Sequence, residues 1–256
     1  MKKVLILLLI VFVSVSCSED DSNNDGSGGV DMSANLQPTG SSSNDLLSDI
    51  TYTSIVIELV YVEGFQPTQT AVSNFVSFLE DRTFKPGGIT VEARSIPSPG
   101  LSPYTTQEIA DIESANRTKY NTDNQVAIWA FFADGEADGN SDNELTLGTA
   151  YRNTSFVIYE ESIDDLSGGT FQPSQTVLES TVIHHEFGHI LGLTNLGAPL
   201  QSDHEDEENP KHCDVESCLM YFAAETGAGA TEMVSGGNVP QLDSQCIADL
   251  QANGGK

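Results

Sequence analysis

Two histidines four residues apart, with a glutamate beside the first, are the part of this 256-residue chain best suited to chemistry: His185, Glu186 and His189. Positions four apart lie on one face of an α-helix, so both imidazoles can bind one metal ion from the same side. Glu186 is rotated by roughly 100° from His185 and can reach a water molecule on the metal instead. Zinc lowers the pKa of such a water to about 7, and a nearby carboxylate can take its proton and return it to a leaving amine. The pattern predicts zinc-dependent peptide hydrolysis with Glu186 as general base.

A glycine follows this pair at the spacing that ends a helix. Gly192 lies three residues after His189 and can adopt the left-handed conformation that turns the chain back. Here the sequence resembles the metzincins, whose extended pattern HExxHxxGxxH is followed by a methionine turn. The chain departs from that pattern at Asn195, which occupies the position of the third ligand and is a poor zinc ligand.

Further along, residues 212–221 (HCDVESCLMY) place a methionine eight residues after a histidine. This stretch resembles the matrixins from their third zinc histidine to their methionine turn, and it also fits the HC-x4-C-x-M segment of the archaemetzincins. We interpret residues 194–211 as a loop insertion, which costs little closure entropy. His212 is then the third zinc ligand and Met220 the turn beneath the metal. His204, inside the insertion, is the alternative third ligand.

The same segment resembles a group of bacterial lipoprotein "membrane metalloproteases" that also carry a long loop between the two motifs. The resemblance implies an α/β (α+β) fold, a metzincin-like zincin. Its parts are a mixed twisted sheet with two helices, an active-site helix, and a small C-terminal subdomain with the methionine turn. In that family an edge strand binds the substrate in extended form, which implies a substrate strand at residues 147–156 here. An edge strand with no substrate role is the alternative. Tyr221 is a candidate for orienting or stabilising the oxyanion, because it follows Met220 directly.

The N-terminus has the layout of an export signal. A basic start precedes an apolar run, residues 4–13, which is too short to span a bilayer. Small residues then precede Cys17, which resembles a bacterial lipobox; this predicts a signal peptide over residues 1–16 and a lipid on Cys17. A plain signal peptide that contains a cysteine is the alternative. The acidic residues after Cys17 resemble the surface-export signal of Bacteroidetes lipoproteins, which implies a lipid anchor in the outer membrane and exposure at the cell surface.

Composition and pattern divide the rest of the chain into two parts. Residues 17–47 contain few apolar side chains and are predicted to be a flexible acidic tether. Residues 48–256 suit a single catalytic domain. Within it, strands alternate with helices, which favours a mixed α/β sheet. The expected strands are 53–62, 89–93 and 125–132, with a fourth strand or a hairpin at 147–160. The expected helices are 67–82, 105–120, 172–193 and 242–250.

The charge balance restricts the possible partners. Ten basic residues against 38 acidic ones give a net charge of −28, which argues against nucleic acid as a partner. We expect a monomer whose partners are a protein or peptide substrate and, through the lipid, a membrane.

Three cysteines remain after the lipidation site, and an oxidising compartment favours a disulfide. Cys213–Cys218 is the local pairing, and either of them with Cys246 is the alternative.

An acidic loop offers a second kind of metal site. Oxygen donors alternate with small residues there, as in calcium loops, and they are Asp134, Glu136, Asp138, Asn140 and Asp142. The candidate calcium ligands are Asp134, Asp138 and Asp142. Leu145 stands where an EF-hand has its last glutamate, so the loop is not an EF-hand. Calcium binding is one interpretation, and a plain acidic turn is the other.

Three functions are compatible with these motifs. The first is a zinc endopeptidase that cleaves extracellular proteins. The second is a zinc aminopeptidase, as some archaemetzincins are held to be. The third is a non-catalytic, surface-anchored binding lipoprotein that contains a metal. Glu186 favours an enzyme, because a structural zinc has no use for a base beside a vacant coordination position.

Overall fold

The computed structural model of the chain describes residues 32–141 and 145–256. The predicted signal peptide, the lipidation site Cys17 and the tether up to residue 31 lie outside the described residues, as does Asp142. Within the described ranges, no helix is long and apolar enough to cross a membrane.

A five-stranded sheet forms the centre of the molecule, and its strand order is β2-β1-β3-β5-β4. The first four strands in this order pair in parallel, and β4 runs antiparallel to β5 at the edge. This arrangement confirms the predicted mixed α/β class. The strands are β1 (Ser54–Val62), β2 (Ile89–Ile96), β3 (Gln125–Ala133), β4 (Gly148–Arg152) and β5 (Ser155–Tyr159).

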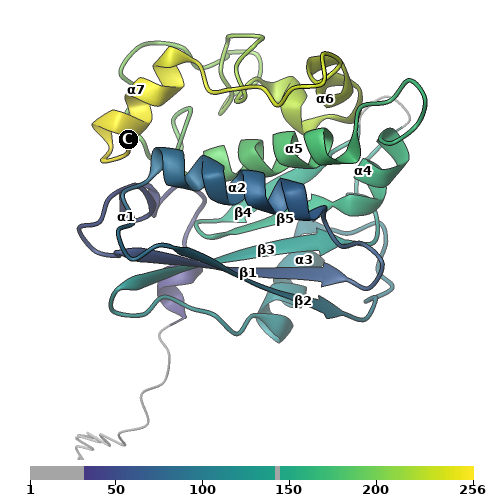
Figure 1. The fold of residues 1–256 in the computed structure, drawn as a ribbon, viewed down its shortest axis with the longest axis horizontal. Helices are drawn as coiled ribbons and strands as arrows, with labels where there is room; N and C mark the ends of the chain where they lie inside the picture. Colours follow the sequence, from purple (N-terminus) through teal and green to yellow (C-terminus); the bar gives the residue numbers. More distant parts are fainter. Residues whose placement is uncertain (1–31, 142–144) are drawn as a thin grey trace, which may run out of the picture.

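Helices cover both faces of this sheet (Figure 1). On one face, α2 (Gln69–Arg82) and α5 (Gln175–Ile190) pack over side chains such as Ile128 of β3. On the other face, α3 (Thr106–Asn116) packs over side chains such as Trp129. Successive side chains of a strand point to opposite faces, so a strand covered on both sides is continuously apolar. This explains the unbroken apolar run of β3.

The chain after α5 forms a small lobe on the far side of this helix from the sheet (Figure 1). The lobe contains loops, the short 3₁₀-helix η2 (Phe222–Glu225), α6 (Gly227–Met233) and α7 (Ser244–Ala252). It corresponds to the predicted C-terminal subdomain. Elsewhere the shorter elements are η1 (Ser33–Asn35), α1 (Ser43–Leu47) and α4 (Glu160–Leu166).

The folded domain begins earlier than the predicted boundary at residue 48. Leu46 and Leu47 are fully buried in the core, and Asn35 is fully buried against the sheet. The amide of Asn35 donates to the Ala127 carbonyl and to the Thr154 hydroxyl, each at 3.1 Å. Residues 32–47 are therefore part of the domain. The sequence predicted a tether here because most of these residues are polar, and only a few side chains hold the segment in the fold.

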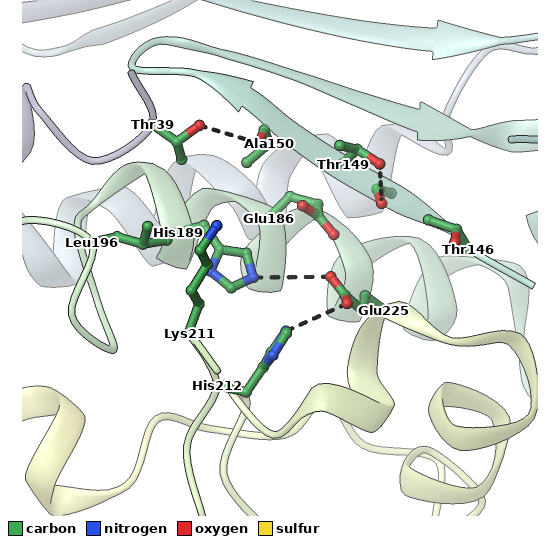
Figure 2. Close-up of a pocket in the computed structure, with 11 residues that line it drawn as sticks. Thr39, Thr146, Thr149, Ala150, Glu186, His189, Leu196, Lys211, His212 and Glu225 are labelled. Carbon is green, nitrogen blue, oxygen red and sulfur yellow. Dashed lines mark hydrogen bonds and ion pairs between the residues drawn. The ribbon is translucent and has the colours of Figure 1, made fainter. Parts of the chain in front are cut away.

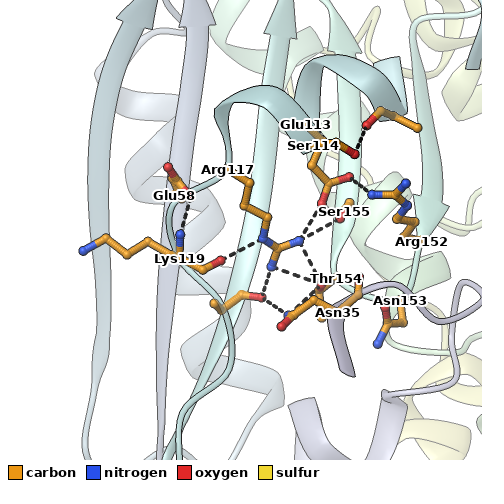
Figure 3. A network of polar contacts seen from close by, with 12 residues as sticks. Asn35, Glu58, Glu113, Ser114, Arg117, Lys119, Arg152, Asn153, Thr154 and Ser155 are labelled. Atoms are coloured by element: carbon orange, nitrogen blue, oxygen red, sulfur yellow. Dashed lines mark hydrogen bonds and ion pairs between the residues drawn. The ribbon is translucent and has the colours of Figure 1, made fainter. Parts of the chain in front are cut away.

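A buried polar network connects α3 to the edge of the sheet (Figure 3). The Arg117 guanidinium donates to Glu113 Oε1 at 2.6 Å and to the Ala127 carbonyl at 2.8 Å. The second oxygen of Glu113 accepts from Arg152 at 2.9 Å, and its first also accepts from Ser155 at 2.7 Å. A buried ion pair stabilises a fold only when its remaining hydrogen-bonding groups are satisfied. Here they are, and the network fixes the β4–β5 hairpin.

Two buried glutamates meet at the first half of α5, one in this helix and one at the start of α4. Glu179 accepts hydrogen bonds from the backbone and the hydroxyl of Thr68. Glu160, at the start of α4, is fully buried and receives a hydrogen bond from Gln175 at 3.2 Å. Burial, followed by the contact with Glu179, raises the pKa of Glu160 well above its usual value. Glu160 therefore retains its proton to a higher pH in the folded protein than in the unfolded chain.

This buried acid makes a prediction for stability. The unfolded state releases the proton above a pKa of about 4.3, whereas the folded state retains it to a higher pH. The contribution of Glu160 to the free energy of unfolding is therefore complete below that pH. It is lost as the pH rises towards the pKa of Glu160 in the folded state. Glu160→Gln should leave stability nearly unchanged at pH 4.5 and increase it at pH 8. The gain is about 1.4 kcal/mol for each unit of pKa elevation that lies below the working pH. Urea unfolding at both pH values measures this, with the exposed Glu80→Gln as control. Parallel pH dependences of wild type and Glu160→Gln would contradict it.

Candidate active site

Helix α5 carries the predicted metal-binding pair in a buried setting. It begins after Ser174, whose hydroxyl caps the backbone of Val177, and its residues 178–190 are all buried. His185 has no exposed surface and Glu186 is 1% exposed. Polar side chains at such positions require partners from the lobe or a bound ligand.

The structure brings His212 to this pair. His185 Nε2 and His189 Nε2 are 3.1 Å apart. The ring of His212 lies with its centroid 5.3 Å from that of His185 and 5.1 Å from that of His189. The three histidines predicted as zinc ligands thus form one cluster. Figure 2 shows two of them, His189 and His212, at the pocket beside this cluster.

The end of α5 and the inserted loop account for this convergence. Gly192 has a φ of +83°, and a Cβ there would lie 2.7 Å from the Ala198 nitrogen, so only glycine fits the turn. The hydroxyl of Thr194 donates to the carbonyl of Lys211, which joins the two ends of the insertion 194–211. The loop therefore returns to the end of the helix, and the next residue is His212.

His204, the alternative third ligand, lies outside the cluster. It is fully buried, its Nε2 is 2.8 Å from Asp249 Oδ2, and its Nδ1 is 3.5 Å from Cys213 Sγ. Asn195, the residue at the spacing of the metzincin pattern, donates to Glu205 instead.

The methionine turn lies directly against α5. Met220 is fully buried, and a Cβ on Gly188 would lie 2.2 Å from its sulfur. This contact explains the glycine between Glu186 and His189. The carbonyl of the preceding residue, Leu219, is 2.8 Å from His185 Nδ1. Because a carbonyl only accepts, Nδ1 carries the proton, and the lone pair of Nε2 is free to face the cluster.

Glu186 lies beside the histidines with one oxygen unused. Its Oε1 is buried and has no hydrogen-bond partner. A Cβ on Gly148 of β4 would come within 2.7 Å of the Glu186 side chain, so the edge strand leaves room for this carboxyl group. Burial, and then the charge of Glu225, raise the pKa of Glu186 well above its usual value. A raised pKa suits a group that accepts and returns a proton near neutral pH.

Glu225 joins the cluster, although no motif indicated it. Its carboxylate oxygens lie 3.6 Å from His185 Nε2 and 3.4 Å from His212 Nε2. Burial opposes the charged form of Glu225, but the contacts with these histidines outweigh it and hold its pKa well below the usual range. The sequence offers no signal for this residue beyond its place five positions after Met220.

The donor set fits a divalent metal ion such as zinc. Several buried nitrogens of the cluster, including both of His212, have no hydrogen-bond partner. Buried polar atoms rarely lack a hydrogen-bond partner, so these nitrogens are suited to bind a metal ion. Burial, followed by the charge of His185, lowers the pKa of His189 well below its usual value, so this ring is neutral. Neutral imidazole is the form that binds metal.

The cluster opens into a cavity of about 280 Å³ (Figure 2). The edge strand β4 forms one wall, in the region where the sequence placed the substrate strand. Thr39 stands at the far end of this wall and donates to the Ala150 carbonyl at 3.2 Å. The lining residues are Thr39, Thr146, Gly148, Thr149, Ala150, Glu186, His189, Leu196, Lys211, His212 and Glu225.

Two predicted roles find no support in this geometry. Tyr221, the candidate oxyanion group, is not among the residues that line the cavity and instead packs against Phe222, with ring centroids 4.7 Å apart. In the acidic loop, Asp134 accepts from the Tyr104 hydroxyl. Within the described ranges, Asp134 and Asp138 belong to no group of converging metal ligands. The calcium interpretation therefore gains nothing from the structure.

A second group of potential metal ligands lies beneath the methionine turn. Cys213, Cys218, Cys246 and Asp243 bring their ligand atoms within 4.8 Å of one another. Backbone amides of Met220 and Asp243 each donate to Cys218 Sγ at 3.4 Å. The thiol contacts of Cys213 and then Cys246 lower the pKa of Cys218 to about 3. Thiolates held in this way are ligands of structural zinc.

The predicted Cys213–Cys218 disulfide is not formed, and all three of these cysteines are free. The alternative pairing is absent as well, since Cys218 Sγ and Cys246 Sγ are 3.7 Å apart, far longer than a disulfide bond of about 2.05 Å. The sulfurs converge on a common point with Asp243 rather than pairing. Spacing alone could not reveal this, because Cys246 and Asp243 come from a distant part of the chain.

Comparison with known proteins identifies the fold. No protein-family model and no curated protein sequence matches the chain. Among solved structures, archaemetzincin from Methanopyrus kandleri is similar with 18% identity and a TM-score of 0.52, over 78% of this chain and 96% of that one. Metalloproteinase-II from Bacteroides fragilis aligns with 12% identity and a TM-score of 0.41, over 82% of this chain and 60% of that one. The similarity to archaemetzincin confirms the predicted metzincin-like architecture.

The cysteine cluster makes a prediction that metal analysis can check. If the cluster holds zinc, Cys246→Ser should lose one metal ion per chain relative to wild type, because it removes one of four ligands. Ser244→Ala, on the exposed side of the same helix, should retain it. After denaturation with a chelator, Cys213, Cys218 and Cys246 should all react with a thiol reagent. Two unreactive cysteines among them would contradict the cluster and indicate a disulfide.

Proposed function

We propose that this protein is a zinc-dependent endopeptidase of metzincin type that cleaves extracellular proteins. The observation that carries this is the convergence of His185, His189 and His212 beside the unpartnered carboxyl of Glu186, in a cavity walled by an edge strand. The fold shared with archaemetzincin supports the proposal.

His185, His189 and His212 would hold the zinc ion. When bound, zinc polarises a carbonyl and lowers the pKa of water to about 7. His185 is already oriented for this, because the Leu219 carbonyl holds its Nδ1 proton and leaves Nε2 free. Such hydrogen bonds fix ring orientation and strengthen metal binding.

Glu186 would move the proton. As the oxygen of water bonds to the carbonyl carbon of the substrate, the carboxylate takes the proton that the water releases. The protonated carboxyl then delivers it to the nitrogen as the carbon–nitrogen bond breaks. The buried position of Glu186 keeps bulk water away from this exchange, and its raised pKa brings its proton affinity closer to that of the groups it serves.

The free edge of β4 would hold the substrate. Its other edge pairs with β5, so an extended peptide can add to the sheet as a further strand beside Glu186. The backbone of the peptide then runs along the cavity wall, which positions one carbonyl at the histidine cluster.

One observation favours an aminopeptidase as the second candidate. The segment around Thr39 covers β4 beyond Ala150, and it packs so closely on the loop after α5 that a Cβ on Gly40 would lie 2.0 Å from the Leu196 carbonyl. A peptide antiparallel to β4 would have its N-terminal side at this end. The covered end limits how many residues can precede the bond that is cut.

We infer the cellular location of the enzyme from its N-terminal sequence. The signal-like residues 1–16 and the lipobox-like Cys17 support export and a lipid anchor, with the domain at the surface of the outer membrane. We expect it to act there as a monomer on protein or peptide substrates. Its net charge of −28 argues against nucleic acid as a partner.

Glu186→Gln tests the chemistry. The amide has the same size but cannot take a proton, so cleavage of casein and of an internally quenched peptide should fall by about 10²–10⁴-fold. Zinc content should stay at the wild-type level, because Glu186 is not a ligand. Glu80→Gln, on the surface of α2, is the matched control and should cleave normally.

The outcomes separate the candidate functions. Cleavage inside a peptide with a blocked N-terminus supports the endopeptidase, whereas cleavage only of aminoacyl substrates indicates the aminopeptidase. Wild-type activity in Glu186→Gln would contradict the assigned role. If the zinc-loaded wild type cleaves nothing, a non-catalytic metal-containing binding lipoprotein remains.

A further inference from the structure

Glu225 lies where the three histidine rings converge. Its Oε2 is 3.6 Å from His185 Nε2 and 3.9 Å from His189 Nε2, and its Oε1 is 3.4 Å from His212 Nε2. Figure 2 shows the carboxylate directed at the rings of His189 and His212. Within the described residues, Glu225 is the only acid that belongs to this group of ligand atoms, and Glu186 lies outside it.

These separations match those between ligands of one metal ion. In a tetrahedral zinc site with bonds of about 2.0–2.1 Å, neighbouring donor atoms are roughly 3.3–3.4 Å apart. The distances from Glu225 to the three Nε2 atoms, 3.4–3.9 Å, and the 3.1 Å between His185 and His189 lie close to this range. The carboxylate therefore lies at the distances from the three nitrogens that a fourth ligand of one ion would have.

We propose that Glu225 is a fourth ligand of the bound metal and closes the site in the resting protein. The inference rests on the proposed function, since it takes a zinc ion on the three histidines as given. Structural zinc sites have four protein ligands, whereas catalytic sites leave one position for water or substrate. Peptide hydrolysis then requires the carboxylate of Glu225 to leave this position, so Glu225 acts as a gate to the catalytic state.

The setting of Glu225 allows such a movement of the side chain alone. The side chain is 30% exposed, unlike those of His185 and Glu186. Its backbone is fixed, because the Glu225 carbonyl accepts from the amide of Leu147 at 2.8 Å. Leu147 directly precedes β4, the strand proposed to bind substrate. A peptide that adds to β4 therefore lies next to Glu225 and can compete for its position.

The test compares Glu225→Gln and Glu225→Ala with Glu232→Gln, which changes an exposed acid of α6. Zinc affinity of the full-length protein is measured by competition with a chelator, and the protein loaded with Co²⁺ alone is followed by visible absorption. Both Glu225 variants should bind zinc about 10- to 100-fold more weakly, by analogy with other changes around metal ligands. Their Co²⁺ spectra should change, and Glu232→Gln should match wild type. Acetohydroxamate should bind zinc-loaded Glu225→Ala more tightly than wild type, because it has no carboxylate to displace.

Zinc affinity and Co²⁺ spectra that stay at wild-type values in both Glu225 variants would overturn the proposal. The cysteine cluster contributes equally in all four proteins, so the differences report the histidine site. Circular dichroism confirms that the variants are folded, and Glu225→Gln preserves the size of the side chain. If the metal measurements agree with the proposal but the wild type cleaves no peptide, Glu225 stands as a ligand while the proposed peptidase function fails.

Discussion

The second half of helix α5 is enclosed between the sheet and the C-terminal lobe, and this enclosure controls the rest of the site. His185, Glu186 and His189 lie where bulk water cannot satisfy them, so their partners have to come from the protein or from a bound ion. The lobe approaches closely because Gly188 has no side chain, which lets the sulfur of Met220 rest on the helix. A larger residue at position 188 would have to displace the Met220 side chain from this contact.

The same approach gives His185 its orientation. The carbonyl of Leu219, next to Met220 in the turn, accepts from His185 Nδ1. The turn is itself connected to the cysteine cluster, since the Met220 amide donates to Cys218 Sγ. The methionine turn thus connects the cysteine cluster to the orientation of the His185 ring. A change in the cysteine cluster is expected to alter that orientation.

Sequence patterns predicted the parts of the fold that depend on local periodicity. The strands of the sheet and helices α2 and α5 follow from apolar spacing, because each buries a continuous face. The first two histidines follow from helical spacing as well. The structure also places His212 with them, which the sequence could indicate only through its distance from Met220. Between Thr194 and Lys211 no periodic rule applies, and the contact that joins these residues depends on tertiary structure.

Other features were beyond local patterns for the same reason. Glu225 reaches the histidines because the amide of Leu147, next to the edge strand, holds its backbone in place. Asp243 and Cys246 join the cysteine cluster from helix α7 and its N-cap, far along the chain. Residues 32–47 read as a tether, yet Leu46 and Leu47 complete the core. In each case one or two side chains determine where the segment packs. Local composition, which is a mean over many residues, does not reveal them.

Anomalous diffraction at the zinc absorption edge, from crystals of the full-length protein grown with zinc, tests the central claim most directly. The account predicts a peak between the Nε2 atoms of His185, His189 and His212. A peak at His204, or no peak at the three histidines in zinc-loaded crystals, would contradict it.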